Sequence, residues 1–126
     1  MNVASIVPAD QILGPAVGDL GEGNLVVLRD PQGSVPTYHL VAAAQIVSAD
    51  AIATMLREAV GMPLLALPAV RCDALDLTPM GNQPTGREMM ITFEARSGVS
   101  TGISAADRAL TMRVAAAPQS TAADIV

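Results

Sequence analysis

The chain has 126 residues, a length that suits one domain with its own hydrophobic core. Hydrophobic residues make up 51% and charged residues 15%, a composition that excludes a disordered chain. The formal net charge of −5 has no basic cluster beside it, which argues against nucleic acid as a partner. Cys72 is the single cysteine, so the chain has neither an internal disulfide nor a multi-cysteine metal site.

The first 20 residues contain Pro8, Gly14 and Pro15, and we predict them to be irregular apart from a short helix near residues 10–13. This amino end has no basic region ahead of an apolar run, so we predict neither a signal peptide nor a membrane span. A cytoplasmic protein without a membrane partner is the expectation. Because the apolar content is high, we also expect a homodimer that buries part of the apolar surface.

Two strands and a helix are predicted in the middle of the chain. Residues 24–29, "NLVVLR", form a β-rich run bounded by turn residues, which is typical of a buried strand. Ser48 is a suitable N-cap, and apolar residues at helical spacing after it predict a helix that ends near Gly61. Residues 62–67, "MPLLAL", predict a second short strand.

A further strand and helix are predicted after residue 87. Residues 88–95 alternate between two faces, as a strand does. Ser104 and Asp107 resemble a capping box, with Asp in place of the usual Glu, and predict a helix through about residue 115. We predict that regular structure thins out in the tail after Pro118. Alternating strands and helices predict an α+β fold, a layered α/β sandwich, in a single domain over residues 1–126.

Several stretches, in order, resemble the 3,4-dihydroxy-2-butanone 4-phosphate synthase family. They are "GEGNLVVLRD", "AQIVSADAIATMLREAVGMPLLAL", "LDLTPM" and "GREMMITFEARSGVSTGISAADRALTMR", and they span residues 21–113. The resemblance implies the first half of that family's fold. It also implies descent from a riboflavin-pathway enzyme that converts ribulose 5-phosphate.

The resemblance also exposes a departure in the loop after the first strand. The family carries Arg-Glu-x-Glu-Gly-Asp there, with a magnesium-binding glutamate, and alignment places "SVPTYH", residues 34–39, at this loop. Val35 then stands where the family has a glutamate, and it cannot supply the oxygen ligand that magnesium needs. The family's later Arg-x-Gly-His-Thr segment would follow Val126. We therefore expect no metal, no cofactor and no activity on ribulose 5-phosphate.

The substitutions in the implied site are mostly apolar. Leu64 and Ala66 lie in the strand where the family usually has cysteine, and Thr85 stands where it often has histidine. One interpretation is a pocket refitted for a largely apolar small molecule, and the other is a site that collapsed into ordinary core. The residues expected to bind the ligand are Val35, Thr37, Leu64, Ala66, Thr85, Arg87 and Thr101. For Arg87 a solvated surface residue is the favoured alternative.

Candidate catalytic groups are few. His39 is the single histidine, and with Tyr38 it is the first candidate for acid or base chemistry, ahead of Glu88 and Asp30. A lone loop histidine is also commonly just solvated. Further along the chain, two roles are open for Thr101, a ligand-facing hydroxyl or a structural one, while Ser104 and Asp107 are expected to cap a helix and Arg108 to form a salt bridge.

These expectations combine into one function with an alternative. The first is a repurposed, metal-free enzyme of specialised metabolism, of the isomerisation, cyclisation or dehydration type, that acts on an apolar metabolite. The alternative is a non-catalytic small-molecule binder or accessory subunit that keeps the family's dimer surface. An inert remnant of a larger enzyme is a third reading, which the well-kept strand and helix patterns disfavour.

Overall fold

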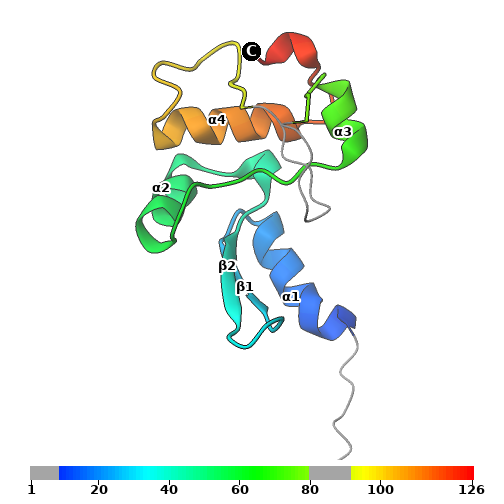
Figure 1. The fold of residues 1–126 in the computed structure, drawn as a ribbon, viewed down its shortest axis with the longest axis vertical. Helices are drawn as coiled ribbons and strands as arrows, with labels where there is room; N and C mark the ends of the chain where they lie inside the picture. The colour runs from blue at the N-terminus through cyan, green and yellow to red at the C-terminus, as the bar shows by residue number, and fades with distance from the viewer. Residues whose placement is uncertain (1–8, 80–91) are drawn as a thin grey trace, which may run out of the picture. The chain divides into compact units, whose positions relative to one another are not determined.

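The computed structural model describes residues 9–79 and 92–126, with side chains from residue 13 onward. The chain divides into two compact units, Met1–Ala43 and Ala44–Val126, here called unit 1 and unit 2 (Figure 1). Helices occur in both units, and the named strands of the described residues pair in one antiparallel sheet of unit 1. This mixture confirms the predicted α+β class. None of the helices in the described residues is long and apolar enough to cross a membrane.

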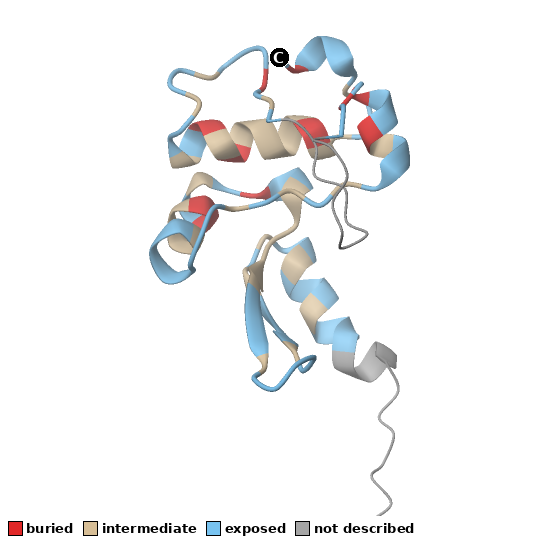
Figure 2. Ribbon diagram, in the orientation of Figure 1, coloured by how far each residue is buried: buried red, intermediate tan, exposed pale blue. Residues whose placement is uncertain are grey.

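Unit 1 consists of a helix and a hairpin. Helix α1 spans Ala9–Gly21, and strands β1 (Val26–Asp30) and β2 (Thr37–Val41) follow it. The strands pair in the register Val26↔Val41 to Asp30↔Thr37. The connecting loop contains Gly33 at φ +100°, a conformation that glycine adopts without a steric penalty. In unit 1, no residue from 13 to 43 is buried (Figure 2).

Unit 2 is built around α4 (Ala105–Ala116), which packs against α2 (Ala49–Glu58) and the short 3₁₀ helix η1 (Ala44–Ile46). Helix α2 begins where the sequence predicts, because the hydroxyl of Ser48 accepts a hydrogen bond from the N–H of Ala51 at 3.0 Å. Arg113 of α4 donates to the carbonyl of Val47 at 2.6 Å. This hydrogen bond ties Val47, the residue before the N-cap of α2, to α4.

The other end of unit 2 holds a hydrophobic cluster. Helix α3 spans Ala69–Ala74, and the 3₁₀ helix η2 spans Ala122–Asp124. Residues in and beside these two helices, together with Ala115 of α4, form a buried cluster of Cys72, Leu75, Leu77, Ala115 and Ile125. The guanidinium of Arg71 donates to the carbonyls of Ala115 at 2.8 Å and Pro118 at 3.3 Å, which fixes the chain as it leaves α4. The tail after Pro118 is therefore part of the packed structure, and the prediction that it thins out is wrong.

Three other local predictions need correction or qualification. The amino end forms a helix of 13 residues with Pro15 inside it, although Pro15 removes one backbone hydrogen bond of that helix. Residues 62–67 form no strand, although their exposure alternates as a strand's would, with Leu65 and Leu67 packed against the core and Leu64 and Ala66 exposed. Of the predicted strand at 88–95, residues 88–91 lie outside the described residues, and Ala95 forms an isolated bridge with Ile125.

Candidate functional site

A tight turn precedes helix α4 and coincides with the most distinctive motif in the sequence, "GVSTGISAAD". Gly98 has φ +83° and Gly102 has φ +74°, both in the left-handed region that favours glycine. A Cβ at Gly98 would lie 2.9 Å from Cδ2 of Leu110, and a Cβ at Gly102 would collide with the carboxylate of Glu94. Both glycines of the motif are therefore required by the backbone and by its close neighbours.

The carboxylate of Asp107 is the common hydrogen-bond acceptor of this turn, residues 98–104. It accepts hydrogen bonds from the backbone N–H groups of Ser100, Thr101 and Gly102 at 3.2, 2.8 and 3.0 Å. The hydroxyls of Ser100 and Thr101 donate to the same carboxylate at 3.3 and 2.9 Å. Asp107 is only 5% exposed, so its charge is balanced by donors of the turn instead of by water.

These hydrogen bonds act on the acidity of Asp107. The N–H of Thr101 is the largest cause and lowers the pKa of the carboxyl group, while burial opposes it. The N–H of Ser100 and the hydroxyls of Thr101 and Ser104 lower the pKa further. The net result is a pKa well below the usual range of an aspartate. Asp107 is therefore ionised at neutral pH and serves as a fixed hydrogen-bond acceptor, since a carboxylate of such low pKa holds no proton to donate and is a weak base.

The two hydroxyls of the turn differ in their remaining hydrogen-bonding capacity. Thr101 donates to Asp107 and accepts from the N–H groups of Ile103 and Ser104 at 3.4 and 3.3 Å, which uses one donor and two acceptor positions. Ser100 donates to Asp107, no described residue donates to its hydroxyl oxygen, and the residue is exposed. Sequence reasoning missed Ser100, although it stands beside Thr101 in the same motif. Thr101 as a ligand-binding residue stays a prediction.

The capping expectation at this helix is half right. Ser104 caps α4 by accepting from the N–H of Asp107 at 3.0 Å. The carboxylate of Asp107 does not accept from the backbone N–H of Ser104, which donates to the hydroxyl of Thr101 instead, but accepts from the N–H groups of the preceding loop. Arg108 donates to the carbonyl of Ile103 at 3.0 Å, and among the described residues it does not form the expected salt bridge.

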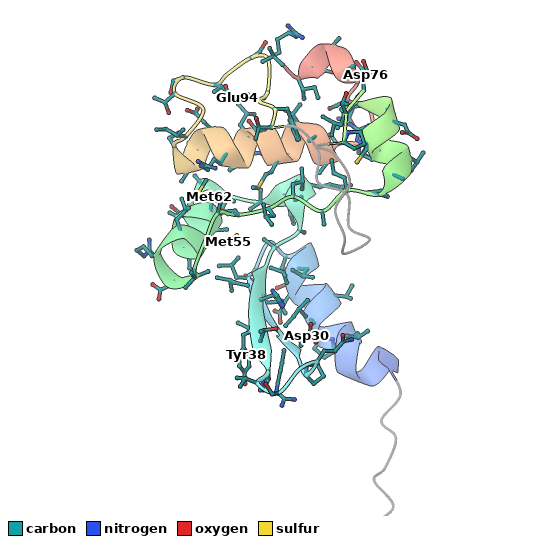
Figure 3. All side chains as sticks on the ribbon, in the orientation of Figure 1. Asp30, Tyr38, Met55, Met62, Asp76 and Glu94 are labelled. Atoms are coloured by element: carbon teal, nitrogen blue, oxygen red, sulfur yellow. The ribbon has the colours of Figure 1, made fainter. Side chains whose placement is uncertain are left out.

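The first candidate catalytic residues lie on the hairpin of unit 1. Tyr38 and His39 lie within strand β2, not in a loop as the alignment implied. Residues that pair directly across an antiparallel ladder share a face, so Asp30, Thr37 and His39 lie on one face and Tyr38 on the other (Figure 3). The hydroxyl of Thr37 lies 3.4 Å from Nε2 of His39. His39 and Tyr38 therefore face opposite sides of the hairpin.

The expected ligand-binding residues lie in different parts of the chain. Val35 is 73% exposed in the hairpin loop of unit 1, whereas Leu64, 76% exposed, and Ala66 lie in unit 2. Thr101 lies on the turn of unit 2. Thr85, Arg87 and Glu88 lie outside the described residues. Their proposed roles, like those of the hairpin residues, stay predictions.

The described residues do not suit a magnesium ion by themselves. No three His, Cys, Asp or Glu side chains come together in residues 9–79 and 92–126. Asp30 is the carboxylate at the start of the hairpin loop, and it already accepts from the N–H of Gln32 at 2.9 Å. Asp107 is enclosed by the donors of its own turn. No catalytic step is therefore derived through a metal.

The turn and the fold around it define the class of protein. Residues 15–126 match the family model of 3,4-dihydroxy-2-butanone 4-phosphate synthase, which covers most of the chain. The chain therefore belongs to the 3,4-dihydroxy-2-butanone 4-phosphate synthase family.

Solved structures and curated relatives agree with this assignment. The Candida albicans synthase superposes with a TM-score of 0.80 at 30% identity, over 90% of this chain and 57% of that one. The two-domain synthase RibBX of A. baumannii gives a TM-score of 0.80 at 34% identity, over 90% of this chain and 34% of that one. The synthase of Pseudomonas aeruginosa is 36% identical over 87% of this chain. The chain spans 31% of that relative and 26% of the riboflavin biosynthesis protein RibBA of Mycobacterium ulcerans, which is 38% identical over 86% of this chain.

These relatives overturn the functional expectation. Proteins similar to this chain carry the names of a synthase and of riboflavin biosynthesis proteins, so a repurposed enzyme of specialised metabolism is the wrong interpretation. That interpretation depended on apolar residues expected to line a pocket. Val35, Leu64 and Ala66 are exposed in the structure, and their roles as ligand-binding residues stay predictions.

Proposed function

We propose that the chain takes part in riboflavin biosynthesis as a 3,4-dihydroxy-2-butanone 4-phosphate synthase, with the turn at residues 98–104 on the substrate side. The proposal is supported by the family match over residues 15–126 and by the relatives, which are a 3,4-dihydroxy-2-butanone 4-phosphate synthase and riboflavin biosynthesis proteins. The observation that carries it is the Asp107-centred turn. The motif that most strongly marks the family is also the segment whose backbone is most constrained by glycines and buried hydrogen bonds.

The turn suggests a specific role for Ser100. A sugar phosphate carries several hydroxyl groups that need hydrogen-bond acceptors when they leave water. Ser100 is exposed and its hydroxyl proton is directed toward Asp107, so the lone pairs of its oxygen can accept from a substrate hydroxyl. The role of Asp107 is to hold Ser100 in this orientation and to keep the turn rigid before the substrate arrives.

Turnover of ribulose 5-phosphate by the purified chain tests this function. Formation of 3,4-dihydroxy-2-butanone 4-phosphate is measured with magnesium present, for the wild type and for Ser100→Ala. Loss of one neutral hydrogen bond corresponds to roughly 0.5–1.5 kcal/mol, so kcat/KM should fall about 2- to 12-fold. Ser97→Ala, at an exposed serine just before the turn, is the matched control and should leave kcat/KM unchanged. Folded wild-type chain that forms no product would contradict the proposed function.

A further inference from the structure

The last residues of the chain form an arm that pairs with the segment leading into the turn. Glu94 and Val126 exchange both main-chain hydrogen bonds, at 2.8 and 2.9 Å, and the N–H of Arg96 donates to the carbonyl of Asp124 at 2.8 Å. Ala95 and Ile125, which face each other in this bridge, are both buried. Residues 121–126, here called the C-terminal arm, are therefore fixed to residues 94–96.

One guanidinium group reinforces this pairing. Nε of Arg96 donates to the carbonyl of Ala123 at 2.6 Å, and Nη2 donates to the carbonyl of Ile125 at 2.7 Å. These are short, charge-assisted hydrogen bonds to two carbonyls that lie two residues apart. The rigid fork of arginine spans both carbonyls at once, whereas the ammonium group of lysine is a single point charge.

The segment clamped in this way also contacts the turn. Glu94 lies above α4 (Figure 3), and its carboxylate occupies the space that a side chain at Gly102 would need. The N–H of Ala95 donates to the hydroxyl of Thr111 on α4 at 3.1 Å. Residues 94–96 thus lie between the C-terminal arm and the turn, so displacement of the arm changes the support of the turn.

We propose that Arg96 is a positioning residue that couples the C-terminal arm to the turn at residues 98–104. This inference rests on the proposed function, in which the turn presents Ser100 to the substrate. Arg96 holds the arm against residues 94–96 and thereby keeps Glu94 against Gly102. Its guanidinium hydrogen-bonds the arm and neither Ser100 nor Asp107 among the described residues, so it acts on the turn through the segment that it clamps.

Amide hydrogen exchange of the whole chain, followed by NMR, tests the coupling without requiring activity. In Arg96→Ala, the N–H of Val126 should exchange about tenfold faster or more, and those of Thr101 and Gly102 should also accelerate. The N–H of Ile52, which donates to Ser48 in α2, should keep its wild-type rate. Arg96→Lys should give intermediate rates because lysine can replace one of the two hydrogen bonds. Arg57→Ala is the control, since Arg57 is exposed and its ion pair with Glu58 is long at 3.6 Å.

Two results would overturn the inference. Faster exchange at Val126 with unchanged Thr101 and Gly102 would show that the arm and the turn are independent. Equal acceleration at Ile52 would show that Arg96 contributes only to the overall stability of the unit. In the active protein, Arg96→Ala should lower kcat/KM mainly through a raised KM, because Ser100, which it positions, hydrogen-bonds a hydroxyl of the substrate. If the wild type forms no product, the proposed function fails, while the exchange experiment still decides the coupling.

Discussion

Substitution of Gly102 by alanine probes the geometry of the turn most sharply. At φ +74° the added Cβ costs about 1–2 kcal/mol, offset by about 0.4–1 kcal/mol because alanine restricts the unfolded chain. The Cβ would also collide with the carboxylate of Glu94. Since the Glu94 side chain is exposed it can rotate away, at a cost of roughly 0.5–1.5 kcal/mol if it leaves its rotamer. We expect Gly102→Ala to destabilise the protein by about 1–2 kcal/mol in total.

Urea unfolding at pH 7, followed by circular dichroism, measures this loss, and two further variants divide it into its parts. Gly61→Ala is the matched control because Gly61 has φ +97° and no atom within 4 Å of the added Cβ, so it reports the backbone cost alone. Gly102→Ala made in a Glu94→Ala background should lose only that backbone cost. The reasoning is refuted if Gly102→Ala is as stable as the wild type, or if removal of the Glu94 carboxylate leaves its cost unchanged.

Three further substitutions test the core, the turn and a helix cap. Leu75→Ala should destabilise by about 2–5 kcal/mol in urea because Leu75 is 1% exposed in the core, whereas Leu64→Ala at an exposed position should change stability by less than about 0.5 kcal/mol; similar losses for both would argue against the packing described. Because the folded pKa of Asp107 is lowered, its stabilisation is complete above the unfolded pKa of about 3.9 and is lost as the pH falls through the folded value. The difference in unfolding free energy between wild type and Asp107→Asn should therefore shrink in acid, and a pH-independent difference would contradict the ionised acceptor. Ser48→Ala should cost about 1 kcal/mol through loss of the α2 cap, with Ser97→Ala neutral, and equal effects would remove the cap as the cause.

Local sequence signals were sufficient where the structure depends on neighbouring residues. Ser48 and Ser104 both cap helices as expected, since a cap needs only a side chain and an N–H three residues later. Strand β1 and the family resemblance were also predicted from the sequence, but the expectation that this strand is buried is wrong, since none of its residues is buried. The α+β class followed from these elements.

Other features depend on contacts between segments that the sequence alone does not pair. Asp107 was read as half of a capping box, because nothing in the local pattern shows that the preceding turn curls back over its carboxylate. The tail was read as loose because Ile125 becomes a core residue only when it meets Cys72 and Leu75 from another helix. Strand β2 lies where the family resemblance implies a loop, although the β-branched and aromatic residues of "TYHLV" favour a strand. The homodimer, its small-molecule ligand and the hairpin candidates stay predictions.

Genetic complementation tests the central claim most directly. The whole chain is expressed in a bacterial strain that requires riboflavin because it lacks 3,4-dihydroxy-2-butanone 4-phosphate synthase. We predict growth without added riboflavin for the wild type and for Asp73→Asn, an exposed aspartate on α3, and loss of growth for Asp107→Asn, which removes the acceptor that organises the turn. If the wild-type chain accumulates as folded protein and the strain still requires riboflavin, the proposed function is contradicted.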